Sequence, residues 1–239
     1  MFLRELGFTP INTPHPALAQ IMFIGSILDP LNNNFKGIIF GAGFLRPDRI
    51  KDIRSAKVIA VRGKLTKKNL GIDYEVLFGD PGLLLPFFIA ERPPKRFSLG
   101  IVPHYQEKTD KRIHAWALRF GEDACVIDVF SSPTDVFKKI CQCEMIISSS
   151  LHGIVVADSL GIPNVWMKLS ERDEFKYHDY YSAFDEDVAP YYPTREESLH
   201  AIEVKKREPP PSVREAQFKL FDEFQGLKKI LELEGFSRR

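Results

Sequence analysis

The clearest secondary-structure pattern in the chain lies in residues 140–167, with the sequence ICQCEMIISSSLHGIVVADSLGIPNVWM. The apolar run at 145–147 has the length of a buried parallel strand. Apolar residues then recur at helical spacing, at Leu151, Ile154, Val155, Ala157 and Leu160. Gly161 and Pro163 predict the end of that helix, and residues 164–167 predict the next strand. The stretch therefore predicts a strand–helix–strand crossover unit.

A polar loop follows the first strand of this unit. It contains Ser148, Ser149 and Ser150. Ligands in open α/β sheets bind at the carboxyl ends of strands, where helix N-termini attract anions. We expect Ser149 or Ser150 to cap the helix, and His152 to lie in its first turn, where it can change protonation when an anionic ligand arrives. A plain helix cap beside a surface histidine fits the same residues, so the loop alone leaves both interpretations open.

The remainder of the chain repeats short apolar strands followed by glycine or polar residues. Further strands are expected at residues 21–24, 37–40, 57–61, 74–78, 97–102 and 124–129. Further helices are expected at 110–119, 133–141, 195–202 and 212–234. Apolar residues expected to face the core from these helices are Ala117, Leu118, Phe218, Phe221, Leu227 and Ile230. Strands that alternate with helices in this way predict an α/β fold with parallel sheets.

Several strand ends in the first half carry residues suited to ligand binding. Gly25, Ser26 and Gly43 follow two of the strands, where glycine permits a tight turn and a close backbone approach. Arg62 ends the third strand and can hold a carboxylate or a phosphate, or form a salt bridge within the domain. Asp80 follows the fourth strand and can cap the next turn or act as a base.

Composition excludes several classes of protein. Hydrophobic residues make up 44% and charged residues 27%, which is typical of a globular protein, and the net charge of +1 gives no bulk attraction to nucleic acid. Three cysteines without a CxxC pair predict reduced thiols and no metal site. No apolar run reaches the length of a membrane-spanning helix, and the first residues lack a signal-peptide pattern, so we expect a cytoplasmic protein.

Five segments, in order, resemble the polysaccharide pyruvyl transferase family. They are AVRGKLTKKNLG at 60–71, FGDPGLLLP at 78–86, IVPHY at 101–105, SSSLHGIVVADSLGIPNVW at 148–166 and FKYHDYYSAF at 175–184. The resemblance implies two Rossmann-like lobes in a GT-B-like arrangement, with a shortened N-terminal lobe. It also implies transfer of a pyruvyl group from phosphoenolpyruvate (PEP) to a sugar of an exopolysaccharide, capsule or cell-wall glycan, forming a pyruvate ketal without a cofactor.

The resemblance and the polar linker at 91–96 together predict three regions. Residues 1–92 are expected to form the acceptor-side lobe, 93–195 the donor-side lobe, and 196–239 helices that pack back across the lobes. A lipid-linked glycan acceptor would bring peripheral contact with the inner face of the membrane.

Roles for individual residues follow from the same resemblance. His152 and Asp80 are the expected catalytic residues. The expected donor-binding residues are Ser148, Ser149, Ser150, Leu151, Gly153, His104 and Lys176. The expected acceptor-side residues are Arg62, Gly25, Ser26, Gly43 and Asp179.

One position departs from the family pattern. Many members carry arginine immediately before the Leu-His pair, where this chain has Ser150. Either Lys176 or another cation replaces that arginine, or the donor binds weakly, or the donor differs. Two alternative functions stay open, a GT-B nucleotide-sugar glycosyltransferase and a non-catalytic glycan-binding relative.

Overall fold

The structure is a computed structural model that describes residues 2–8, 13, 15, 18–49 and 51–233. It divides into two compact units that are not consecutive in sequence. Unit 1 consists of Met1–Leu84, Glu174–Glu186 and Arg214–Arg239, and unit 2 consists of Leu85–Asp173 and Asp187–Val213. The segment 174–186, expected in the donor-side lobe, therefore belongs to unit 1.

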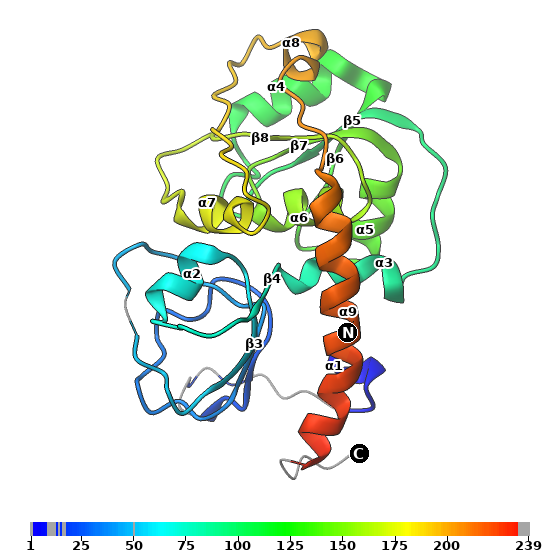
Figure 1. The fold of residues 1–239 in the computed structure, drawn as a ribbon. Helices are drawn as coiled ribbons and strands as arrows, with labels where there is room; N and C mark the ends of the chain where they lie inside the picture. The colour runs from blue at the N-terminus through cyan, green and yellow to red at the C-terminus, as the bar shows by residue number, and fades with distance from the viewer. Residues whose placement is uncertain (1, 9–12, 14, 16–17, 50, 234–239) are drawn as a thin grey trace. The chain divides into compact units, whose positions relative to one another are not determined.

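Unit 1 contains a parallel sheet with the strand order β1-β2-β3-β4. Its strands are β1 (Ile21–Met22), β2 (Ile38–Phe40), β3 (Lys57–Val61) and β4 (Leu77–Phe78). Its helical segments are α1 (Phe2–Glu5), α2 (Lys64–Asn69), the 3-10 turn η2 (Pro81–Leu84) and α7 (Phe175–Ser182). All four strands run in one direction, so the residues that follow them lie at one edge of the sheet (Figure 1).

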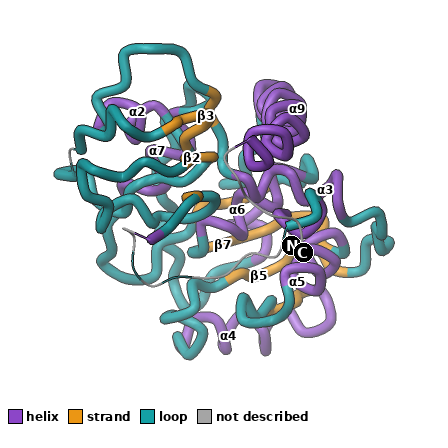
Figure 2. Tube along the Cα trace, turned by 90° about the horizontal axis from the view of Figure 1, so that it is seen from below, coloured by secondary structure: helices purple, strands orange, loops and turns teal. Residues whose placement is uncertain are grey.

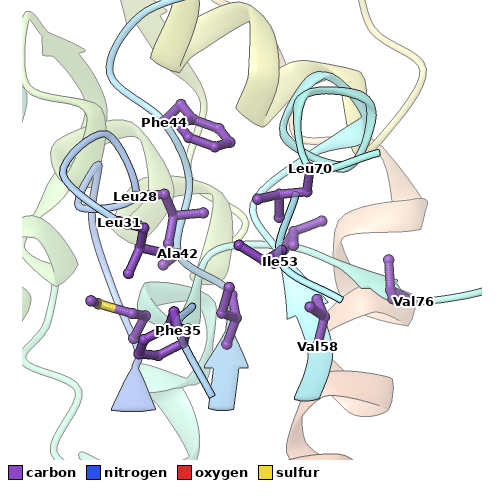
Figure 3. Close-up of a cluster of buried hydrophobic side chains, with 12 residues drawn as sticks. Leu28, Leu31, Phe35, Ala42, Phe44, Ile53, Val58, Leu70 and Val76 are labelled. Carbon is purple, nitrogen blue, oxygen red and sulfur yellow. The ribbon is translucent and has the colours of Figure 1, made fainter. Parts of the chain in front are cut away.

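The core of unit 1 lies against this sheet. Figure 3 shows its buried side chains pointing toward one another, among them Leu28, Leu31, Phe35, Phe44, Ile53 and Leu70. Phe175, on α7, packs against the same cluster. This contact ties a segment from late in the sequence to the N-terminal sheet.

Unit 2 contains a second parallel sheet, with the order β6-β5-β7-β8. Its strands are β5 (Phe97–Val102), β6 (Ala124–Val126), β7 (Cys143–Ser148) and β8 (Asn164–Trp166). Its helices are α3 (Leu85–Phe88), α4 (Lys111–Phe120), the 3-10 turn η3 (Gly121–Asp123), α5 (Pro133–Cys141), α6 (Leu151–Ser159) and α8 (Leu199–Glu203). Figure 1 shows α4 on one face of the sheet, and α5 and α6 on the other. The prediction of an α/β protein with parallel sheets is confirmed.

The crossover unit predicted at 140–167 is present as β7, α6 and β8. Strands β7 and β8 are parallel, and Gly161 has the left-handed φ of +67° that ends a helix. Strand β6 is shorter than the predicted 124–129. Asp128 ends it, because its carboxylate accepts the N–H of Phe130 at 2.9 Å and turns the chain.

The predicted buried faces of two helices were partly wrong. On α4, Leu118 is 86% exposed, and the buried residues are Ile113 and Trp116. Trp116 is held by its indole N–H, which donates to the Thr194 carbonyl at 3.0 Å.

The second helix is α9 (Pro211–Leu233), where Phe218 is 49% exposed. Leu227 is buried as expected, but it is accompanied by Val213, Gln217, Leu220, Phe224 and Leu231. Phe224 packs against Phe23 and Phe40 of unit 1, with ring centroids 5.9 and 6.2 Å away. Within the described residues, none of the helices is both long and apolar enough to cross a membrane.

Candidate anion-binding site

The strand order of unit 2 creates a switch point between β5 and β7. The chain leaves β5 toward β6 on one side and then returns to β7 on the other. Strands β5 and β7 are paired along their length, with Val102 opposite Ser148 (Figure 2). Ligands of open α/β sheets bind where the strand order reverses, outside the carboxyl ends of the strands. His104 follows β5 and the serine loop, residues 148–150, follows β7, so both lie at this position.

Ser148 fixes the turn from β7 into α6. Its Oγ lies 3.0 Å from the Val102 carbonyl oxygen and 2.8 Å from the Ser150 carbonyl oxygen, and it accepts the Ser150 N–H at 3.0 Å. A Cβ at Gly153 would lie 2.3 Å from that Oγ, so glycine is required for α6 to approach the loop this closely. Ser148 therefore organises the start of the helix from within the sheet.

The start of α6 differs from the prediction that the side chain of Ser149 or Ser150 would cap the helix. Ser150 occupies the N-cap position of α6, but its side chain makes no capping hydrogen bond. Ser149 is buried, and its Oγ accepts the main-chain N–H of His104 at 2.9 Å. The serine loop is thereby linked to the loop after β5, which brings two predicted donor-site residues together.

His152 lies in the first turn of α6, and its side chain is exposed. Leu151, Gly153 and Ser148 around it are buried. The N-terminus of a helix carries outward-pointing N–H groups and a partial positive charge. An exposed imidazole at this position can hold or pass a proton at the place where an anion would bind.

Sequence reasoning missed two residues of this region, Arg172 and Glu107. Arg172 lies in the loop after β8, and its Nη1 is 3.2 Å from His104 Nδ1. Glu107 lies in the loop after β5 and is 6% exposed. The rule that ligands bind at strand carboxyl ends could have found Arg172, because β8 is the next strand of the same sheet.

The predicted acceptor-side residues also come together, in unit 1. The Nε of Arg62 donates to the Asp179 carboxylate at 2.8 Å, and its Nη1 donates to Ser26 Oγ at 2.7 Å. Asp179 also accepts the N–H and the hydroxyl of Thr66, both at 2.7 Å. A Cβ at Gly43 would lie 2.5 Å from Arg62 Cζ, so glycine leaves the space that the guanidinium fills.

This cluster is closed to solvent. The side chains of Arg62 and Asp179 are both 0% exposed. Their bonds join β3 to α7, elements far apart in the sequence. The structure therefore gives the pair a stabilising role in unit 1, while their contact with an acceptor stays a prediction.

Asp80 and Gly25 lie at other strand ends of unit 1. Asp80 is fully buried, and one carboxylate oxygen accepts the N–H of Gly82 at 2.8 Å. This is the capping role that the sequence offered as an alternative to catalysis. Gly25 has a φ of +98°, and its carbonyl accepts the N–H of Gly43 at 3.0 Å, so it shapes the turn after β1.

Lys176 lies on α7, which belongs to unit 1, whereas the serine loop belongs to unit 2. Its Nζ lies 5.0 Å from the centre of the Tyr177 ring. Tyr177, Tyr180 and Tyr181 are buried, so these rings do not form an exposed platform for a sugar.

The three cysteines are free thiols. Burial raises the pKa of the Cys143 thiol to about 12, and burial also raises the pKa values of Cys125 and Cys141. Among the residues that the structure describes, no group of three or more His, Cys, Asp or Glu side chains could hold a metal ion.

The fold defines an α/β protein with a candidate site for a small anion at the switch point of its second sheet. The family model of polysaccharide pyruvyl transferases matches residues 7–171, which is more than half of the chain. The protein belongs to the polysaccharide pyruvyl transferase family.

Two curated relatives match the chain. Uncharacterized protein L143 of Acanthamoeba polyphaga mimivirus is 34% identical over 177 residues, which are 69% of this chain and 60% of that protein. Succinoglycan biosynthesis protein ExoV of Rhizobium meliloti (strain 1021) is 30% identical over 152 residues, or 60% of this chain and 46% of that protein. The chain thus spans about half the length of these relatives. No solved structure matches it significantly.

Proposed function

We propose that this protein transfers a pyruvyl group from PEP to two hydroxyls of a sugar in an exopolysaccharide. Family membership supports pyruvyl transfer, and the name of the ExoV relative supports a polysaccharide context. The observation that carries the proposal is the exposed His152 at the N-terminus of α6, beside the serine loop at the switch point. A GT-B-like arrangement of the two lobes, a lipid-linked acceptor and peripheral membrane contact are further parts of the proposal.

The reaction requires an acid, anion-binding groups and a base. A proton is added to the methylene carbon of PEP, which leaves a cationic centre at the neighbouring carbon. The two sugar hydroxyls add to this centre in turn and lose their protons, while the bond to phosphate breaks. One of these two protons replaces the proton that was added to the methylene carbon, and the other leaves with the phosphate.

The residues of unit 2 suit the donor half of this chemistry. The first N–H groups of α6 would bind the phosphate, because a helix N-terminus stabilises negative charge. His152 would transfer the proton or stabilise the departing phosphate. Ser148 and Ser149 would act indirectly, by holding the loop in shape. Asp80 is the proposed base, and Arg62 and Asp179 are the proposed acceptor-side pair. Because all three side chains are buried, this part of the proposal requires that acceptor binding uncovers them.

Phosphate release in the presence of PEP and a panel of acceptor glycans tests the proposal. The wild type should release phosphate only when an acceptor is present, and His152→Ala should reduce the rate by about 100-fold or more. His200→Ala is the matched control, because that imidazole is an exposed surface group with 85% of its side chain accessible. Undiminished release by His152→Ala would reject the role of His152.

Calorimetry separates this function from the alternatives. PEP should bind, whereas UDP and GDP should not. Binding of UDP or GDP without PEP would instead identify a nucleotide-sugar glycosyltransferase. Sugar affinity without phosphate release at any acceptor concentration would identify a non-catalytic relative.

A further inference from the structure

Arg172 is a positively charged side chain that contacts the edge of the candidate site. Its Nη1 lies 3.2 Å from His104 Nδ1, and it also donates to the side-chain oxygen of Gln106. The main-chain N–H of His104 donates to Ser149 Oγ at 2.9 Å. One histidine therefore connects the guanidinium to the serine loop, and all four residues belong to unit 2.

Arg172 is held firmly along one edge. Its Nε lies 3.2 Å from the Glu107 carboxylate and 2.8 Å from the Ser170 hydroxyl. The Ser170 hydroxyl itself donates to Glu107. Glu107 is 6% exposed, and a buried carboxylate bound in this way fixes the plane of the guanidinium.

One terminal nitrogen of the guanidinium, Nη2, is not used in the same way. None of the contacts that the described part of the chain makes with Arg172 involves Nη2, and 33% of the side chain is exposed. Glu107 balances the charge of Arg172 in the free protein. An approaching anion would therefore meet a pre-oriented guanidinium whose Nη2 N–H groups can still donate hydrogen bonds.

The same contacts determine the tautomer of His104. Arginine can only donate hydrogen bonds, so His104 Nδ1 must accept from Arg172. The main-chain N–H of Gln106 also points to Nδ1, at 3.4 Å. With Nδ1 as the acceptor, the ring proton of the neutral imidazole lies on Nε2. Arg172 therefore also positions His104 as an N–H donor.

None of the three residues of the serine loop, Ser148, Ser149 and Ser150, carries a positive charge. We propose that Arg172 supplies the positive charge that binds the anionic donor at this site, with His104 as its partner. This inference rests on the proposed function in one respect, that the donor is PEP. The chemistry recognised is a small oxyanion, which is either the phosphate or the carboxylate of PEP.

Calorimetry on the full chain with PEP, inorganic phosphate and pyruvate tests this inference. Arg172→Gln should weaken PEP binding by about tenfold or more, because a hydrogen-bonded charge is lost. Arg172→Lys should bind with intermediate affinity, since it keeps the charge but loses the planar geometry. Arg119→Gln is the matched control. Arg119 is exposed in the last turn of α4 and donates to the Glu196 carbonyl at 2.6 Å rather than to a residue of the candidate site, so wild-type affinity is expected.

Two further measurements exclude a merely structural role. The ring-nitrogen NMR shifts of His104 should change in Arg172→Gln and not in Arg119→Gln, because only the first change removes the guanidinium from Nδ1. Arg172→Gln also leaves the buried Glu107 without the guanidinium that compensates its charge, although the Ser170 hydroxyl still donates to it. The double variant Glu107→Gln/Arg172→Gln removes this uncompensated charge and should show the same weak PEP binding.

The outcomes separate this inference from the proposed function. Weak PEP binding by both Arg172 variants, in a protein that transfers no pyruvyl group, would support the anion site and reject the function. Pyruvyl transfer with an unchanged KM for PEP in Arg172→Gln would overturn the inference alone. Wild-type protein that binds none of the three anions would overturn the inference as well. Selective loss of phosphate or of pyruvate affinity would support it and identify the group that Arg172 contacts.

Discussion

Asp110 shows how a single residue can start a helix and make its stability depend on pH. Its carboxylate accepts the Arg112 N–H at 2.8 Å as the N-cap of α4, and it also binds the Arg112 guanidinium at 2.9 and 2.7 Å. The side-chain hydrogen bond from Arg112 is the largest cause that holds the pKa of Asp110 below its usual value. The ionised carboxylate is therefore more stable in the folded protein than in the unfolded chain.

The pH dependence follows from this lowered pKa. A carboxyl group with a depressed folded-state pKa stabilises the fold above its unfolded-state value, and this contribution disappears as the pH falls through the folded-state pKa. Asp110→Asn should lower the free energy of unfolding by about 1 kcal/mol at pH 7, and the loss should shrink below about pH 4. Urea denaturation at several pH values measures it. Arg112→Gln should show the same pH-dependent loss, and a loss that stays constant down to pH 3 would contradict this explanation.

At the scale of elements, α6 and the serine loop depend on one glycine. Gly153→Ala would place a methyl group 2.3 Å from Ser148 Oγ and 2.8 Å from Val102 Cγ1. We expect this overpacking to cost about 1–3 kcal/mol of unfolding free energy and to impair phosphate release as the loop shifts. Gly226→Ala on α9 is the matched control. A Cβ there meets nothing within 4 Å, so the better helix former should stabilise the protein by about 0.5–1 kcal/mol. Wild-type stability and activity in Gly153→Ala would show that the loop can adapt.

The elements were largely predictable from sequence, because strand and helix periodicities are local. Helix α5 has the predicted bounds, 133–141, since Ser132 caps it and Pro133 begins it. The buried face of α9 was harder to predict, because Phe218 and Phe224 are equally apolar and only the tertiary partners of Phe224 decide between them. The candidate site shows the same difference between local patterns, which were predictable, and contacts between distant residues, which were not. The serine loop and His152 were evident from one stretch, whereas the contact between Arg172 and His104 joins residues from two distant loops.

At the scale of the whole molecule, the pair Arg62 and Asp179 is the expected weak point of unit 1. Removing one member of a buried ion pair leaves the other charge without compensation, so Asp179→Ala should destabilise unit 1 by about 3–5 kcal/mol. Asp185→Asn is the control, because Asp185 pairs with Lys64 at an exposed position and asparagine tolerates its φ of +59°, so stability should change by less than about 0.5 kcal/mol.

The two units can be followed separately in this experiment. Both tryptophans of the chain, Trp116 and Trp166, belong to unit 2, so their fluorescence reports unit 2. Because each unit has its own core, Asp179→Ala should speed hydrogen exchange in β3 and α7 while the tryptophan transition keeps its midpoint in urea. A tryptophan transition that shifts together with the exchange would show that the chain unfolds as one cooperative body.

Asp179 also has a practical consequence for anyone who shortens this protein. The family match ends at residue 171, and a gene truncated there would still encode every strand of both sheets. Such a product would carry Arg62 in its interior without the carboxylate that neutralises it. Proteolytic trimming or recombinant expression to that boundary should therefore yield insoluble material, and only fragments that also keep α9, whose Phe224 packs against Phe23 and Phe40, should remain in solution.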